Sequence, residues 1–291
     1  MVSREVYEVL KAYEKMGVVE LIPAENLPTS SETGFNPDSW IFRTGDRVYQ
    51  NDCVMRAKTK FVASIDSDEI MIPQGNLTML EFLENEIKND PKVGGFQLFH
   101  QAMQYDPKKM SHLKASRKDF DWKKLEYDWL KTASIHNKNW AMGKSINMPD
   151  HVNIISIHFI AQMQHPYKIL DVPHAKAVYY HVRISWLGKE NPTKENNSHL
   201  YEPKLRSFFN DDFVKTVLSN YQKVMKEVET NMGRKPITYY EVFDILPKCL
   251  KDWRSYHQCS PLVMCYKDLS NFTEWVYANP SNYEAKYLLT L

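Results

Sequence analysis

Residues 60–73 read Lys-Phe-Val-Ala-Ser-Ile-Asp-Ser-Asp-Glu-Ile-Met-Ile-Pro, a run of apolar and small residues that ends abruptly in three carboxylates. We expect residues 61–65 to form a strand of a buried parallel sheet, because such strands are apolar on both faces and carry charge only where they leave the sheet. In open α/β sheets, ligands bind at that carboxyl end. In extended backbone, Asp66 and Asp68 would point to the same side, since side chains alternate with a period of two.

Two carboxylates on one side would form an oxygen-rich site that suits Mg²⁺ or Mn²⁺. A cation held there can bridge to a diphosphate and neutralise the charge that develops on it as a leaving group. The alternative is a solvated acidic turn or a helix cap. A calcium loop is disfavoured, because Ile70 and Met71 stand where that loop needs an oxygen ligand and a glycine. The apolar run that resumes after the carboxylates and stops at Pro73 favours a fixed pocket.

The composition of the 291-residue chain limits its classes of partner. Lys and Arg number 37 against 36 Asp and Glu, so no overall basic field exists to hold nucleic acid or an anionic membrane. The chain has no run of about 18 apolar residues and no signal peptide after Met1, so we expect it neither to span nor to enter a membrane. Three glycosylation sequons, usable only in a secretory compartment, begin at Asn76, Asn196 and Asn271.

The expected elements alternate between helix and strand. Ser3 is suited to cap a helix that ends at Gly17, and residues 18–22 follow as a strand. A second helix is expected at about residues 47–58, with Cys53 as a small core residue. This alternation predicts an α/β sheet with a mainly helical C-terminal extension. Further expectations are a helix capped by Thr78, strands at 96–99, 152–157 and 175–182, an irregular region at 101–140, and helical sequence at 202–232.

Several motifs occur together in a fixed order. The helical segment 49–58 contains Asn-Asp-Cys and precedes the strand that ends Asp-Ser-Asp-Glu at 66–69. The other motifs are Val9-Leu-Lys-Ala-Tyr-Glu, Gly143-Lys-Ser-Ile, Ile157-His-Phe and His181-Val-Arg. The combination, over roughly residues 5–185, resembles glycosyltransferase family 92.

The resemblance implies a GT-A-like, that is Rossmann-like, mixed sheet flanked by helices. We expect this domain at residues 1–190 and a helical and aromatic extension packed on it at 191–291. In the family, a first strand and a membrane anchor precede the helix with which this chain begins. The resemblance therefore predicts a domain without its first strand, and contact with a membrane only through an anchor absent from this chain.

The activity that the resemblance implies is metal-dependent transfer of a hexose to a glycan acceptor with inversion. The expected donor is UDP-galactose or another UDP-sugar, the expected cofactor is Mn²⁺ or Mg²⁺, and nucleic acid is not an expected partner. The expected location is a Golgi or other secretory-pathway membrane. Two alternatives stay open, namely a non-catalytic relative that binds glycans or another protein, and a metal-dependent hydrolase built from the histidines and acidic residues.

The same resemblance assigns metal ligands. Asp68 is expected to bind the metal directly, and Asp66 to bind the metal or the donor ribose. Glu69 belongs to the motif and is expected to hold neighbouring groups. His181 is the first choice to complete the metal shell and His158 the second, while the alternative for each is an ordinary hydrogen-bonded or surface histidine.

Cationic contacts to the donor are expected from two further residues. Arg183 and Lys144 could clamp the diphosphate, Arg183 through bidentate contact and Lys144 as a point charge, and an exposed cation without such a role is the alternative for each. The general base that deprotonates the acceptor hydroxyl is unknown. Weak candidates lie in a charged stretch that otherwise reads as solvated surface, namely Asp119, Asp121, Glu126 and Asp128.

Overall fold

The computed structural model describes residues 2–22, 46–105, 127–182, 207–234 and 274–276. The chain divides into two compact units. The first comprises residues 1–45, 115–125 and 216–291, and the second comprises 46–114 and 126–215. The expected domain boundary near residue 190 lies outside the described residues and stays a prediction.

Two helices pack together in the described residues of the first unit. Helix α1 (Arg4–Lys15) packs against the part of α5 (Asp211–Met232) that belongs to this unit. Both helices are amphipathic, so each buries an apolar stripe and leaves charged residues outside. The residues at the centre of their contact are Ala12, Val224 and Val228.

The ends of α1 follow the sequence signals. The Ser3 hydroxyl accepts a hydrogen bond from the Val6 backbone N–H at 3.3 Å, which satisfies one of the unpaired donors of the first turn. Gly17 follows the helix at a φ of +71°, a left-handed conformation that glycine adopts without steric cost. Strand β1 (Val2–Ser3) pairs antiparallel with β10 (Trp275–Val276). The Ser3 cap and the Gly17 stop predicted for α1 are both present and are therefore confirmed.

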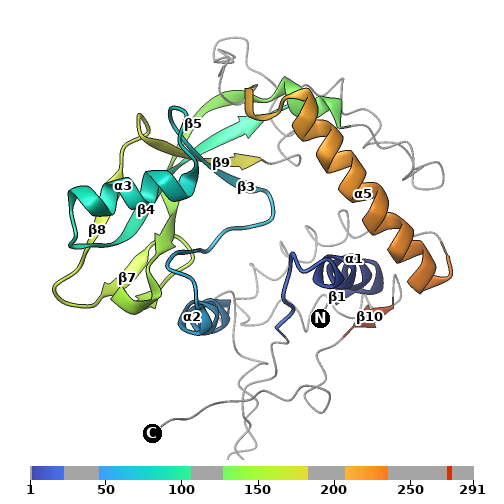
Figure 1. Ribbon diagram of the computed structural model, residues 1–291, viewed down its shortest axis with the longest axis horizontal. Coiled ribbons are helices and arrows are strands. Elements are labelled where there is room, and N and C mark those ends of the chain that lie inside the picture. Colours follow the sequence, from blue (N-terminus) through green and yellow to red (C-terminus); the bar gives the residue numbers. More distant parts are fainter. Residues whose placement is uncertain (1, 23–45, 106–126, 183–206, 235–273, 277–291) are drawn as a thin grey trace, which may run out of the picture. The chain divides into compact units, whose positions relative to one another are not determined.

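A mixed six-stranded sheet forms the centre of the second unit (Figure 1). Its path runs β2-β5-β4-β9-β3, and β8 pairs with β4 beside this path. Strand β4 is antiparallel to β5 on one edge, while its other edge pairs in parallel first with β8 and then with β9. The strands are β2 (Val62–Ala63), β3 (Glu69–Pro73), β4 (Val93–Gln104), β5 (Ser134–Asn147), β8 (Lys168–Val172) and β9 (Ala177–Val182).

One face of this sheet, which we call the α3 face, packs against helix α3 (Met79–Asn89), as Figure 1 shows. The helix begins at Thr78 with a complete capping box, in which the hydroxyl accepts from the Glu81 N–H and the Glu81 carboxylate accepts from the Thr78 N–H. The core of the α3 face consists of Phe82, Leu83, Val93, Phe96, Leu98, Ile146, Val172, Ala177 and Tyr179.

The opposite face has a separate core, to which the 3₁₀ helix η5 (Asp128–Thr132) contributes. Side chains of β9 alternate between the two cores, because Tyr179 belongs to the α3 face while Val178 and Tyr180 belong to the opposite one. The same alternation assigns His181 to the α3 face. The core of the opposite face consists of Ile72, Met103, Tyr105, Leu130, Ala133, Val178, Tyr180, Phe209 and Val214.

Helix α2 (Asp46–Arg56) packs on the hairpin of β6 (Val152–Ile155) and β7 (Ile160–Met163), which follows the 3₁₀ turn η6 (Pro149–His151). The side-chain amide of Asn51 donates to the Ile155 carbonyl at 2.9 Å and accepts from the Ile155 N–H at 2.8 Å. This asparagine therefore satisfies backbone groups of β6 as a neighbouring strand would.

The strand before the acidic run differs from the expectation. Instead of a buried parallel strand over residues 61–65, the structure has the two-residue strand β2, which lies at one edge of the sheet and is antiparallel to β5. The apolar composition of 61–65 has another cause. Phe61, Ala63 and Ile65 line an apolar pocket over the α3 face, where Phe61 is half-buried while Ala63 and Ile65 stay exposed, so this segment is not a core strand.

Three other expectations are wrong. Residues 18–22 contain no strand. Cys53 is exposed, and its neighbour Val54 takes the core position on α2. The region 101–140 is not irregular throughout, because β4 ends at Gln104 and β5 begins at Ser134. The segment 106–126 lies outside the described residues. Where strands form depends on tertiary pairing, which local pattern does not encode.

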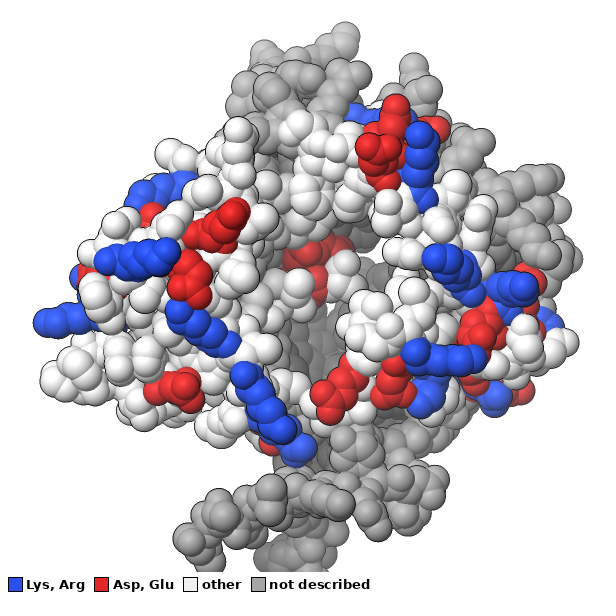
Figure 2. Space-filling model, in the orientation of Figure 1, with Lys and Arg blue, Asp and Glu red and all other residues white. Residues whose placement is uncertain are grey.

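Charges of both signs are interspersed on the described surface that Figure 2 shows. Many of them pair, as Lys60 does with Glu84 at 2.7 Å and Lys176 with Glu86 at 2.8 Å. Such exposed pairs contribute little to stability, on the order of 0–1 kcal/mol each. No helix in the described parts of the chain has both the length and the apolarity needed to cross a membrane.

Candidate functional site

The acidic run folds as a tight turn between β2 and β3. The backbone N–H of Glu69 donates to the Asp66 carbonyl at 3.2 Å, and the Glu69 carboxylate accepts from the Asp66 N–H. Because the chain turns here, the expected alternation of an extended backbone does not apply. The extended backbone on which that expectation depends is absent, and Asp66 and Asp68 contact different partners.

Asp68 lies beside His181. In the antiparallel pairing of β3 and β9, His181 is the register partner of Glu69. The His181 Nε2 atom is 3.2 Å from Asp68 Oδ2, and its Nδ1 atom is 3.9 Å from Glu69 Oε1. His181 is buried, while the side chain of Asp68 is 42% exposed, so one of the two carboxylates can be reached from solvent.

Asp66 lies beside Lys144 of β5. The Lys144 Nζ atom is 3.2 Å from Asp66 Oδ2 and 3.5 Å from Glu69 Oε2. The Lys144 side chain is 1% exposed and that of Glu69 is 2% exposed. Glu69 therefore lies between two groups, Lys144 with Asp66 on one side and His181 with Asp68 on the other.

His100 of β4 is a member of the site that the sequence did not suggest. It is buried, and the centroid of its ring is 4.7 Å from that of His181 at an interplanar angle of 88°, an edge-to-face arrangement. The sequence does contain a signal for it. His100 is a polar residue directly after the apolar segment 96–99, just as the acidic run directly follows an apolar segment. The contact restricts the orientation of the His181 ring.

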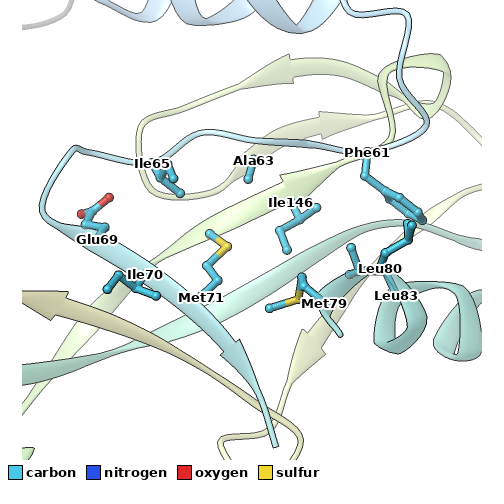
Figure 3. Close-up of a pocket in the computed structure, with 10 residues that line it drawn as sticks. All are labelled: Phe61, Ala63, Ile65, Glu69, Ile70, Met71, Met79, Leu80, Leu83 and Ile146. Carbon is cyan, nitrogen blue, oxygen red and sulfur yellow. The ribbon is translucent and has the colours of Figure 1, made fainter. Parts of the chain in front are cut away.

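A cavity of about 430 Å³ adjoins the acidic turn on the α3 face (Figure 3). Glu69 lies at the edge of this cavity near Ile65 and Ile70 and is the one charged residue among its described lining residues, while the others are apolar. Little water solvates Glu69 on this side, which favours the neutral form of its carboxyl. The remaining lining residues are Phe61, Ala63, Met71, Met79, Leu80, Leu83 and Ile146.

Other residues with an expected role are not part of this group. The His158 Nδ1 atom is 3.2 Å from the Gly143 carbonyl oxygen, and His158 lies outside the cluster around Asp68. Asp128 is exposed and pairs with Lys131 at 2.7 Å. Four expected site residues, Arg183, Asp119, Asp121 and Glu126, lie outside the described residues, and their roles stay predictions.

The donor atoms of Asp68, Glu69 and His181 lie within 4.8 Å of one another, which makes them a candidate metal-binding set among the described residues. Two carboxylates and an imidazole suit Mn²⁺, and Mg²⁺ would prefer oxygen ligands alone. Asp66 is not in this set, while Glu69, expected only to hold its neighbours, is. The set also has an ordinary reading, a hydrogen-bonded Asp–His pair beside a buried carboxylate.

Burial raises the pKa of Glu69 to about 7, while the Asp66 N–H and the Lys144 ammonium act in the opposite direction. Because the pKa is higher in the folded than in the unfolded state, the native protein binds more protons between about pH 4.5 and pH 7. Its free energy of unfolding should therefore fall as pH rises through this window, by on the order of 3 kcal/mol.

The measurement is urea unfolding of the metal-free protein at several pH values, for wild type and Glu69→Gln. The glutamine can still accept from the Asp66 N–H, so the difference between the two curves isolates the titration. Glu81→Gln is the matched control of opposite sign, because hydrogen bonds from Thr78 lower the pKa of Glu81 and its contribution is lost as pH falls. A Glu69→Gln curve parallel to wild type from pH 4.5 to 7 would contradict the prediction.

The fold and site together describe an α/β protein in which the turn before β3 and the end of β9 form a carboxylate–histidine cluster. The sequence profile of glycosyltransferase family 92 matches residues 1–227, more than three quarters of the chain. The chain therefore belongs to glycosyltransferase family 92, which indicates transferase activity. No curated protein matches it.

Proposed function

We propose that this chain is a metal-dependent glycosyltransferase that transfers a hexose from a UDP-sugar to a glycan acceptor with inversion. UDP-galactose is the first candidate donor. The observation that carries the proposal is the 3.2 Å contact of Asp68 with His181 within an acidic motif of a family 92 chain. A GT-A-type arrangement of the mixed sheet, and a secretory-pathway location such as the Golgi, belong to the same proposal.

Asp68, Glu69 and His181 would hold the cation. A bound Mn²⁺ or Mg²⁺ supplies positive charge that stabilises a departing diphosphate. The roles of the three residues differ with their exposure, since Asp68 faces solvent in part while Glu69 and His181 are buried. Asp68 is thus suited to meet an incoming ligand, and the pairing of β3 with β9 fixes the other two in advance.

Inverting transfer also needs a base that takes the proton of the acceptor hydroxyl. Among the candidates in the described residues, Asp128 is exposed and carries an ion pair with Lys131, so it is accessible to an acceptor. Asp119, Asp121 and Glu126 are candidates of the same kind by sequence. The proposal leaves the base among these four carboxylates.

The proposal is tested by calorimetric titration of the protein with UDP, with and without Mn²⁺. We expect saturable UDP binding that needs Mn²⁺, because the cation links the diphosphate to the carboxylates. UDP binding of equal strength in EDTA would contradict metal dependence. If neither UDP nor Mn²⁺ binds, the chain is instead a non-catalytic family member that binds a glycan or another protein.

The donor sugar requires a separate measurement. Incubation with Mn²⁺ and a panel of UDP-hexoses, with and without glycan acceptors, should release UDP fastest with UDP-galactose and only when an acceptor is present. NMR of the product reports the anomeric configuration and so tests inversion. Faster release with another UDP-hexose would change the donor and leave the metal site standing, and hydrolysis of a phosphoester without any sugar acceptor would favour the hydrolase.

A further inference from the structure

Lys144 is the most deeply buried charged residue of the site. Its side chain is 1% exposed, compared with 49% for Asp66. It extends from β5, where residues 143–148 are all buried. An ammonium group in such a place is tolerated only with anionic partners, and Lys144 has two.

These two partners are the two ends of one turn. Asp66 and Glu69 are already joined by two hydrogen bonds that involve their backbone N–H groups. The Lys144 Nζ atom lies 3.2 Å from the carboxylate of the first and 3.5 Å from that of the second. Without this cation, two carboxylates would repel each other across a turn that also has to present Asp68.

We propose that Lys144 is a positioning residue that neutralises Asp66 and Glu69 and so holds the turn with Asp68 against His181. The ammonium has almost no exposed surface and carboxylates as its partners, so a diphosphate has no open approach to it. This role takes the place of the direct diphosphate contact expected from the sequence. Its consequence for catalysis rests on the proposed function, while the pairing itself does not.

The test compares Lys144→Met and Glu69→Gln with their double variant and with one control variant. Methionine keeps much of the length and volume of the lysine side chain and removes the charge. Lys144→Met/Glu69→Gln also removes one of the stranded carboxylates, so it should recover part of the stability that the single variant loses. Lys176→Met is the matched control. Lys176 also pairs with a carboxylate, that of Glu86 at 2.8 Å, but its side chain is 49% exposed, whereas that of Lys144 is buried.

The first readout uses no metal. In EDTA, Lys144→Met should lower the midpoint of thermal unfolding by about 5–10 °C, and the double variant by less than the sum of its single changes. Lys176→Met should shift the midpoint by no more than about 2 °C. Additive shifts for Lys144 and Glu69 would overturn the proposal, whether or not the protein is a metal enzyme.

The second readout is Mn²⁺ affinity, measured by electron paramagnetic resonance at a temperature where each variant is folded. Lys144→Met should bind Mn²⁺ about 10- to 100-fold more weakly, as expected when a residue that orients metal ligands is lost. Unchanged Mn²⁺ affinity with weakened UDP binding would overturn the proposal in favour of a diphosphate contact. If wild type binds no Mn²⁺, the proposed function fails, and the thermal cycle alone decides the role of Lys144.

Discussion

Asp68→Asn should lower kcat/KM for sugar transfer by about 100-fold or more and abolish the Mn²⁺-dependent part of UDP binding, while the protein stays folded. The reason is that Asp68 is the partly exposed carboxylate of the metal-binding set, in contact with His181. An asparagine keeps the size of the side chain and an oxygen acceptor but loses the negative charge. Steady-state kinetics and calorimetry with UDP measure the two effects.

The matched control is Asp171→Asn, an exposed aspartate on β8 of the same sheet that is expected to leave both quantities unchanged. A second comparison separates the histidines. His181→Gln should weaken Mn²⁺ binding, whereas His158→Gln should not, since His158 contacts the Gly143 carbonyl outside the cluster. Transfer by Asp68→Asn at the wild-type rate would remove the metal from the mechanism.

Features of the fold that depend on local chemistry were predictable from the sequence. The cap at Ser3, the stop at Gly17 and the capping box at Thr78 need only side chains within one helical turn, and all three are present. The mixed α/β class follows from the alternation of such elements. The order of the strands and the direction of β2 depend on pairing between distant segments, which residues 61–65 do not encode by themselves.

The candidate site was only partly predictable for the same reason. The acidic run and His181 stood out as polar residues at the ends of apolar segments, and the pairing of β3 with β9 brings them together. The contacts of Glu69 with both Lys144 and His181 could not be inferred, because they depend on the turn and on the positions of β5 and β9. The pairing of Asp66 with Lys144 was not predictable either, because the sequence pattern suggested extended backbone through Asp66 and Asp68.

A single methyl group at Gly143 should disturb both the sheet and the site. A Cβ atom at this position would lie 1.8 Å from the Leu98 carbonyl oxygen, which is backbone of the paired strand β4 and cannot turn aside. Gly143→Ala therefore requires β5 to separate from β4 just before Lys144. We expect the free energy of unfolding to fall by about 3 kcal/mol, which urea denaturation measures.

The control Gly17→Ala separates this clash from the general effect of replacing a glycine. A Cβ at Gly17 meets open space, but its φ of +71° disfavours alanine, so the expected cost is about 1 kcal/mol. Because Lys144 follows Gly143 directly, Gly143→Ala should also weaken Mn²⁺ binding, and Gly17→Ala should not. Equal losses of stability in the two variants would mean that β4 and β5 are not as close at Gly143 as the structure places them, and the position of Lys144 against Asp66 and Glu69 would then lose its support.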